Sequence, residues 1–223
     1  MEKGLMQKVK LVGITKPQIE GLSSPGDLIA YCARVSNPSN QMNTLTAPKL
    51  LKYCVDHKHW SVFETVSATM EIETTRDIAR QILRHRSFSF QEFSQRYADP
   101  TKDLNFVMRE ARLQDTKNRQ NSIDFDDEEL KGEWLIKQSQ VATQAKLTYE
   151  WAISNGIAKE QARSVIPEGL IMSRLYMCGT IRSWIHYVQL RTEAGTQKEH
   201  REIALACAEA IGKIFPLINN FKN

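Results

Sequence analysis

Residues 84–96, RHRSFSFQEFSQR, form the stretch around which the rest of the chain is organised. Together with the segment before it, from residue 76 onward, this stretch contains five arginines, two carboxylates and no lysine, although lysine is common elsewhere. Apolar side chains are interleaved with the arginines, which predicts a half-buried segment, and buried arginines need acceptors. Planar guanidinium groups suit bidentate capture of phosphate or carboxylate, so a bound anion is one way to supply those acceptors. A solvated basic surface or a nucleic-acid patch is the alternative interpretation.

The spacing within this stretch carries more information than its charge. It runs R-H-R, two residues, serine, four residues, serine, one residue and arginine, at Arg84, His85, Arg86, Ser89, Ser94 and Arg96. In this spacing the chain resembles the flavin-dependent thymidylate synthases, whose signature has the same six positions. The pattern is long and chemically unusual, which makes it far more specific than a lone glycine-rich loop.

Two weaker segments upstream resemble the same family. Residues 33–36, ARVS, resemble an early segment of it, and residues 59–65 resemble its His-x-Thr/Ser-Pro-Phe-Glu-His segment. Four positions of the second segment match, namely His59, Ser61, Phe63 and Glu64. Val62 stands in place of the proline and Thr65 in place of the final histidine, so no role of that histidine carries over.

Two further segments match downstream. Arg163 lies a few residues before a proline, where the family has an arginine that contacts the substrate nucleotide. Residues 180–191 resemble a family segment with Arg-Ser near its start and Leu-Arg at its end, although Thr180 and His186 replace two asparagines. At 100° per residue, Arg182 and His186 fall on one side of a helix and Arg191 on the opposite side. One helix can therefore present the first pair to one ligand and Arg191 to another.

The amino-acid composition limits the classes of protein to which this chain can belong. A chain of 223 residues with 41% hydrophobic and 25% charged residues predicts one soluble globular domain over residues 1–223. The formal net charge of +4 suits anionic small molecules or a nucleic acid and does not decide between them. The four cysteines lack metal-ligand or redox spacing, which favours free thiols and a cytoplasmic location. The first five residues do not resemble a signal peptide, and no apolar stretch approaches membrane-spanning length.

Local patterns predict an α+β fold in which an antiparallel sheet packs with several helices. Strands are expected at residues 9–14, 66–74 and 104–108, and helices at 25–35, 48–57, 75–83, 128–154, 159–165, 181–190 and from about 199 to 215. Residues 170–179 are apolar and remain open between strand and helix, and residues 109–127 are expected to form a loop. Expected helix-starting residues are Ser24, Thr74, Thr180 and the Thr196/Glu199 capping box.

Three further expectations concern side-chain placement. Val35 should face inward at the end of its helix, and Trp134 and Trp151 should pack in the core. The helix that begins near residue 75 should present Arg84 at its C-terminal end, and an irregular segment should then carry the serines, Glu92 and Arg96. Two histidines at 57 and 59 lack a third ligand at useful spacing, so we expect no metal site.

The resemblance implies an enzyme that methylates dUMP to dTMP. Methylenetetrahydrofolate would give the carbon, FAD would carry the hydride, NADPH would reduce the flavin, and a homotetramer would build its active sites at subunit interfaces. The implied substrate contacts are Gln81, Arg84, Glu92, Ser94, Gln95, Arg96, Arg163 and Arg191. The implied FAD contacts are Ser61, Arg84, His85, Arg86, Glu92, Thr180, Arg182 and His186. Arg191 is the expected catalytic residue, because a fixed cation stabilises negative charge that develops on the pyrimidine ring.

Two other functions remain open on the sequence alone. A nucleic-acid-binding module would use the arginines of residues 76–96 and would show steep salt dependence and no flavin. A different flavin or nucleotide enzyme on the same scaffold would lack a dUMP-dependent change in its flavin spectrum. For Glu92, a salt bridge to a nearby arginine is an equally simple interpretation. With the thymidylate synthase function we expect neither nucleic acid nor membrane among the partners.

Overall fold

A four-stranded antiparallel sheet forms the centre of the molecule in this computed structural model, which describes residues 8–223. The strand order is β1-β2-β6-β3, with β1 at Lys8–Ile14, β2 at Ser67–Thr75, β6 at Met172–Thr180 and β3 at Ser89–Glu92. β2 and β6 pair along their whole length, and their side chains alternate between buried and partly exposed, as expected when one face of a sheet covers a core. Residues 170–179, left open by the sequence, are therefore largely strand. The expectation about the first five residues lies outside the described residues.

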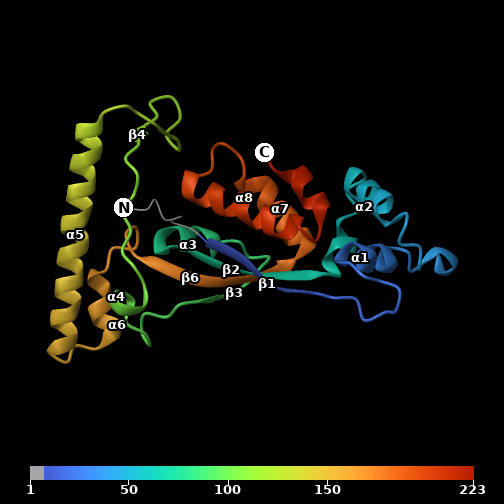
Figure 1. The fold of residues 1–223 in the computed structure, drawn as a ribbon, viewed down its shortest axis with the longest axis horizontal. Coiled ribbons are helices and arrows are strands. Elements are labelled where there is room, and N and C mark those ends of the chain that lie inside the picture. The colour runs from blue at the N-terminus through green and yellow to red at the C-terminus, as the bar shows by residue number, and fades with distance from the viewer. Residues whose placement is uncertain (1–7) are drawn as a thin grey trace.

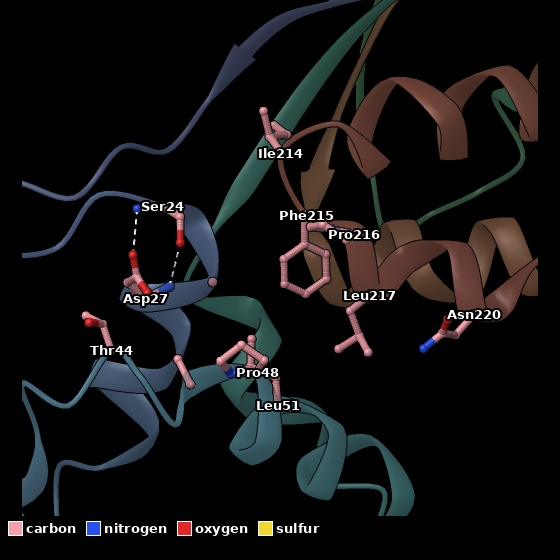
Figure 2. Close-up of a pocket in the computed structure, with 12 residues that line it drawn as sticks. Ser24, Asp27, Thr44, Pro48, Leu51, Ile214, Phe215, Pro216, Leu217 and Asn220 are labelled. Carbon is pink, nitrogen blue, oxygen red and sulfur yellow. Dashed lines mark hydrogen bonds between the residues drawn. The ribbon is translucent and has the colours of Figure 1, made fainter.

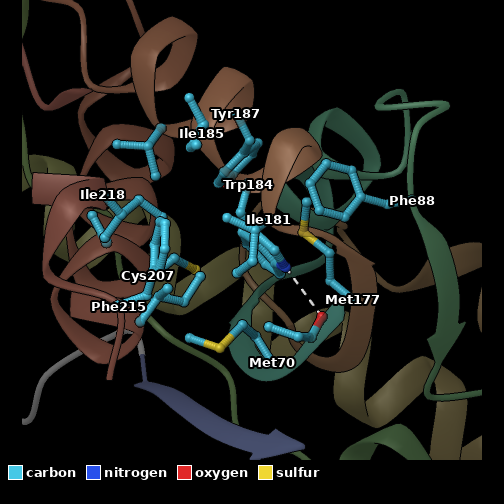
Figure 3. Packing of buried hydrophobic residues seen from close by; sticks show 14 of the residues in the cluster. Met70, Phe88, Met177, Ile181, Trp184, Ile185, Tyr187, Cys207, Phe215 and Ile218 are labelled. Atoms are coloured by element: carbon cyan, nitrogen blue, oxygen red, sulfur yellow. Dashed lines mark hydrogen bonds between the residues drawn. The ribbon is translucent and has the colours of Figure 1, made fainter. Parts of the chain in front are cut away.

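Helices pack on the buried face of this sheet. Figure 1 shows α3 (Arg76–Ile82), α7 (Ile181–Arg191) and α8 (Lys198–Gly212) above the sheet, with α1 (Pro25–Ala33) and α2 (Ala47–Asp56) at one end. The core between these layers includes Trp184, whose indole Nε1 donates to the backbone oxygen of Ala68 at 3.1 Å (Figure 3). The α+β class expected from the sequence is confirmed.

The opposite end of the molecule is built from α5 (Glu128–Ser154), α6 (Lys159–Ala162) and α4 (Pro100–Asp103), as Figure 1 shows. Short 3-10 helices connect the larger elements at Pro38–Asn40, Trp60–Glu64, Arg163–Val165 and Pro216–Phe221. A small hairpin of β4 (Leu113–Gln114) and β5 (Ser122–Ile123) lies within the segment expected to be a loop. Over residues 8–223 there is no helix that combines the length and apolar character needed to cross a membrane.

Several local signals predicted their elements correctly. Ser24 caps α1 in a complete capping box with Asp27, because the serine hydroxyl accepts from the Asp27 N–H and the carboxylate accepts from the Ser24 N–H. Thr180 caps α7 by accepting from the Ser183 N–H. α5 has the bounds expected from its helical pattern, and the Asp127 side chain caps its first turn.

Other local expectations were wrong. Residues 104–108 do not form a strand, and only Phe106 makes a single bridge, to Ile171. The N-cap of α3 is Thr75, because Thr74 faces the core as the last inward residue of β2. Ser89 and Glu92 lie on β3 and not on an irregular segment. Helix α1 ends at Ala33, which leaves Val35 70% exposed.

Two further predictions were also wrong, one about a helix cap and one about a buried helical face. Thr196 and Glu199 do not form a capping box, since α8 begins after Gln197 and has no side-chain cap. Trp134 and Trp151 do not pack in the core, since they are 45% and 61% exposed on α5. The residues of α5 that are buried in this chain are Gln138, Ala142, Ala145, Tyr149 and Ala152.

Replacement of Gly179 should destabilise the fold. A Cβ atom at Gly179 would overlap the ring of Phe88, which is 91% buried and cannot retreat because Trp184 lies 4.8 Å away, centroid to centroid. We expect Gly179→Ala to lower the free energy of unfolding by about 1–3 kcal/mol, the usual cost of overpacking. Urea denaturation would measure this loss. Gly132→Ala is the matched control, because nothing lies within 4 Å of its Cβ position on α5, and it should stabilise slightly. Equal stability of the two variants would contradict the prediction.

Candidate active site

Arg191 and His85 form the central pair of the site. Arg191 is the last residue of α7 and His85 lies in the turn after α3, and Arg191 Nε donates to His85 Nε2 at 2.9 Å. An arginine nitrogen can only donate, so this His85 nitrogen must be an unprotonated acceptor. Burial, reinforced by the charge of Arg191, lowers the pKa of His85 to about 4, so the imidazole is neutral near pH 7. Within the described residues no carboxylate pairs with Arg191, which leaves its charge available to a ligand.

The phase prediction for α7 is confirmed. Arg182 pairs with Glu64, and the ring of His186 lies 5.0 Å from that of Trp60, so both side chains meet the 3-10 helix that begins at Trp60. Arg191 instead meets the turn after α3. Burial, followed by the charge of Arg182, lowers the pKa of His186. The same helix therefore presents cationic and aromatic groups in two different directions.

Ser61 and Thr180 lie near this second group and differ in what they can offer. Ser61 is exposed on the short Trp60–Glu64 helix. The Thr180 hydroxyl already accepts from the Ser183 N–H at 3.3 Å as the cap of α7. Thr180 thus has a structural use, and Ser61 is the freer of the two hydroxyl groups.

Glu92 is held by protein groups. Its carboxylate accepts from Arg80 Nη1 at 3.0 Å and from Ser173 Oγ at 2.9 Å, and it lies 3.5 Å from Arg76 Nη1. A second carboxylate, Glu168, joins the same two arginines. Two of the five arginines of residues 76–96 are therefore neutralised inside the protein. This arrangement fits the salt-bridge interpretation of Glu92 and leaves less basic surface than the sequence suggests.

Arg84 and Arg86 are placed differently from these two arginines. Helix α3 ends at Ile82, so both side chains project from the turn beyond its end, and both are exposed. In the part of the chain that the structure describes, neither makes an ion pair. Their guanidinium groups are accessible to an anionic ligand.

Two further predicted substrate contacts, Arg96 and Arg163, lie at α6, whereas Gln81 lies on α3 and contacts Gln197 and His200. Arg96 pairs with Glu160 of α6 at 3.3 Å, and Arg163 follows directly after that helix. The Ser94 hydroxyl accepts from the Arg96 N–H at 3.4 Å and shapes the turn. Gln95 is buried, and its side-chain Nε2 has no hydrogen-bond partner among the described residues. Arg163 is half-buried without a carboxylate partner in that part of the chain, so this group also retains an uncompensated cation.

Sequence reasoning missed several charged residues that support the site. Arg109 and Arg112 come from the segment expected to be a loop, and both pair with the buried carboxylate of Glu199. Local sequence gave no signal for these pairs. His200 was missed too, although a signal existed: it precedes Ile203, Ala204, Cys207 and Ile211 at helical spacing, so it lies on the buried stripe of α8.

An apolar cavity of about 500 Å³ lies elsewhere in the molecule. It is formed between α1, α2 and the C-terminal segment, where Pro48 and Leu51 face Phe215 and Leu217 (Figure 2). None of its lining residues is among those predicted for substrate or FAD. The candidate site is defined by its arginines and not by this cavity.

The two buried histidines should make stability fall with acidification. Burial, reinforced by the Arg191 charge, lowers the pKa of His85 to about 4, and burial, followed by the charge of Arg191, lowers that of His200 to about 3. Both groups have ordinary values near 6.5 when unfolded, so the unfolded chain binds more protons between pH 6.5 and 4. Over that range His85 alone should remove about 3 kcal/mol from the free energy of unfolding.

Urea denaturation between pH 7 and pH 4 would measure this loss. A His200→Asn variant should show a shallower dependence, because one titrating group is gone. A stability that stays flat over this range in the unmodified protein would show that these histidines are not buried as neutral groups.

Comparisons with known proteins identify the fold and the family of this chain. The fold matches the crystal structure of a UMP/dUMP methylase, PolB from Streptomyces cacaoi bound with 5-Br dUMP, with a TM-score of 0.80 over 96% of this chain and 93% of that one, at 24% sequence identity. The family model described as thymidylate synthase complementing protein matches residues 19–217.

Two curated relatives are considerably closer in sequence. A probable flavin-dependent thymidylate synthase of Paramecium bursaria Chlorella virus 1 is 52% identical, covering 94% of this chain and 95% of its own. The flavin-dependent thymidylate synthase of a Synechocystis strain is 51% identical, covering 94% and 96% respectively. This chain therefore belongs to the flavin-dependent thymidylate synthase family.

Proposed function

We propose that this enzyme converts dUMP to dTMP, with methylenetetrahydrofolate as carbon donor, FAD as hydride carrier and NADPH as reductant. The observation that carries the proposal is the hydrogen bond from Arg191 to a neutral His85, which is one of the six signature residues. Residues 1–223 are assigned to one domain. Free thiols at Cys32, Cys54, Cys178 and Cys207 support a cytoplasmic location.

The residues of the site fit an FAD molecule. Its pyrophosphate needs cationic donors, and Arg84 and Arg86, which are exposed and form no ion pair within residues 8–223, would supply them. Arg182, His186 and Ser61 offer further donors from a separate group around Trp60. When bound, FAD supplies the hydride chemistry, and these side chains hold and orient it.

The substrate contacts divide into phosphate and base functions. Arg96 and Arg163 suit the phosphate of dUMP, since both are cations near α6 and Arg163 lacks a carboxylate partner among the described residues. Glu160 would have to release Arg96 when phosphate arrives, and both partners are exposed, so this release costs little. Ser94 would add a hydroxyl contact.

Arg191 suits the pyrimidine ring. Its Nε is fixed by His85, so its remaining guanidinium donors keep one direction without reorganising during the reaction. A pre-oriented cation stabilises charge that develops in the transition state better than a mobile one. Gln81 lies on α3, where its amide contacts Gln197 and His200 at the start of α8. The same amide would contact the nucleotide.

The spread of these groups supports an active site shared between subunits. Figure 1 shows α6, whose Glu160 binds Arg96, at the end of the molecule formed by α5, whereas the Trp60–Glu64 helix that carries Ser61 packs against α1 and α2 at the opposite end. FAD and dUMP must touch each other for a hydride to pass between them. We therefore assign the active sites to interfaces of a homotetramer, where groups from different subunits meet.

The exposed apolar residues of α5 supply a surface for such contacts. They include Trp134, Leu135, Ile136, Val141, Leu147 and Trp151. A row of large apolar side chains on one helix marks a protein contact surface. Light scattering should give a mass four times that of the 25.6 kDa chain, and Trp151→Glu should lower it. A monomer that turns over at the normal rate would refute the shared site.

The first experiment for the function is a visible absorption spectrum of the purified protein, as isolated and after FAD is added. We expect a bound-flavin spectrum that changes when dUMP is added. A flavin spectrum insensitive to dUMP would indicate a different flavin enzyme. A colourless protein that takes up no FAD would overturn the proposal and favour nucleic-acid binding.

A further inference from the structure

A series of hydrogen bonds passes through Gln81 and connects the buried carboxylate of Glu199 to the buried imidazole of His200. Gln197 Nε2 donates to Glu199 Oε2 at 3.0 Å, and Gln81 Nε2 donates to Gln197 Oε1 at 2.7 Å. His200 Nδ1 then meets Gln81 Oε1 at 3.3 Å, and His200 Nε2 meets the hydroxyl of Tyr187 at 3.1 Å. The members come from α3, α7 and the start of α8, so the series links three elements around the candidate site.

The donors and acceptors in this series of hydrogen bonds can be assigned in only one way. Glu199 is 97% buried and pairs with Arg112 and Arg109 at 2.6 and 3.5 Å. Burial alone would raise the pKa of Glu199, but its own backbone N–H, the hydrogen bond from Arg112 and the nearby arginine charges lower it below the ordinary value. Glu199 is thus a carboxylate that only accepts, which forces Gln197 to turn its NH₂ group toward it.

Each later contact follows from this first one. Gln197 must offer its oxygen to Gln81, so Gln81 turns its NH₂ group to Gln197 and its oxygen to His200. An amide oxygen only accepts, so His200 must carry its proton on Nδ1. His200 is fully buried, and burial, followed by the charge of Arg191, lowers its pKa to about 3, so Nε2 is unprotonated and accepts from Tyr187. Burial raises the pKa of Tyr187, which keeps its hydroxyl proton.

We propose that His200 is a positioning residue that fixes the orientation of the Gln81 amide for the nucleotide. The inference rests on the proposed binding of dUMP, and His200 itself touches no ligand because it is fully buried. A free amide can rotate by 180° and exchange its donor and acceptor. Glu199 through Gln197 and His200 from the other side both oppose that exchange, so Gln81 presents one fixed edge. Preorganised polar groups bind a ligand more tightly, because binding does not have to order them.

Two conservative variants separate the two hydrogen bonds of His200. Asparagine places its NH₂ group near the position of Nδ1, so His200→Asn keeps a donor for Gln81 and loses the bond to Tyr187. Glutamine places its terminal oxygen near the position of Nε2, so His200→Gln keeps an acceptor for Tyr187 and loses the bond to Gln81. Both variants remove the same ring, so a purely structural role would affect them alike.

The test is calorimetric titration of dUMP into the FAD-loaded protein. We expect His200→Gln to raise the Kd for dUMP about tenfold and His200→Asn to raise it at most about twofold, the difference corresponding to one hydrogen bond. In a cycle with Gln81→Ala, the double variant His200→Gln/Gln81→Ala should bind no more weakly than Gln81→Ala alone. Equal losses in the two His200 variants, or additive losses in the double variant, would overturn the proposal.

A second measurement does not depend on dUMP binding. Nitrogen-15 NMR of histidine-labelled protein should show both His85 and His200 as neutral histidines protonated at Nδ1, since the Nε2 atom of each accepts a hydrogen bond, and His200→Asn should remove only the signal of His200. The Nε2-protonated form of His200 would overturn the proposal even if the enzyme binds dUMP normally. If wild-type protein shows the expected tautomer but binds no dUMP, the proposed function fails and the series of hydrogen bonds stands.

Discussion

Arg191→Ala should abolish dTMP formation while the protein remains folded and retains bound FAD. The guanidinium group has no carboxylate partner among the described residues, and His85 holds it in one orientation, at 2.9 Å between Nε and Nε2. Loss of one preorganised donor of this kind costs about 100- to 1,000-fold in turnover. Arg191 is only half-buried at the end of α7, so its removal should leave the core intact. Turnover of dUMP to dTMP and the visible flavin spectrum would be measured on the same sample.

Two controls sharpen this prediction. Arg191→Lys retains the charge but lacks the planar donor group that contacts His85, so it should remain strongly impaired. Arg201→Ala removes another half-buried arginine, whose guanidinium group hydrogen-bonds to the backbone oxygen of Ala194 and makes no ion pair among the described residues, and it should leave turnover unchanged. Wild-type turnover in Arg191→Ala would refute the assignment of Arg191 as the catalytic residue. Loss of flavin in that variant would assign Arg191 to FAD binding instead of to catalysis.

Glu199→Ala should be the most destabilising of the single changes considered. The Glu199 carboxylate is buried and neutralises Arg112, and it shares Arg109 with Asp77. Removal of one partner from a buried ion pair leaves an uncompensated charge, which costs about 3–5 kcal/mol. Arg112 would lose its strongest partner, because its other contact, to Glu110, is longer at 3.4 Å. Urea denaturation at pH 7 would measure the change.

Glu202→Ala is the matched control for this experiment. Glu202 lies on the same helix, is exposed, and makes no ion pair among the described residues, so its removal should change the free energy of unfolding by less than about 0.5 kcal/mol. Similar stabilities for the Glu199 and Glu202 variants would mean that water reaches the Arg109–Arg112 cluster and compensates the lost carboxylate.

Much of the fold could be predicted from the sequence because its signals are local. Ser24 with Asp27 marked the start of α1, Thr180 marked the start of α7, and the helical pattern of residues 128–154 gave α5. Each signal involves side chains within one or two turns of each other, and such contacts form wherever those residues occur. The phase of α7 is equally local, and it placed Arg182 and Arg191 on different sides.

Predictions from local sequence failed where two elements compete for the same residues or where a residue's partner is distant in the sequence. Residues 104–108 alternate like a strand, yet only Phe106 finds a strand partner, at Ile171. Thr74 has the chemistry of a helix cap, but the strand register turns it into the core and leaves Thr75 at the cap position. Trp134 and Trp151 lie on the expected helix, but this chain places no core against them.

The sequence by itself determined the class of enzyme, the α+β composition and the residues of the signature. Only the tertiary structure decided which of the arginines remain free. Arg76 is neutralised by Glu168, 92 positions away, and Arg191 is held by His85, 106 positions away. Such pairs leave no periodicity in the sequence, because they form only when the sheet brings α3, α7 and the start of α8 together. The availability of a charge, the tautomer of a histidine and the orientation of Gln81 all depend on those long-range contacts, since burial and neighbouring charges set them and residue type does not.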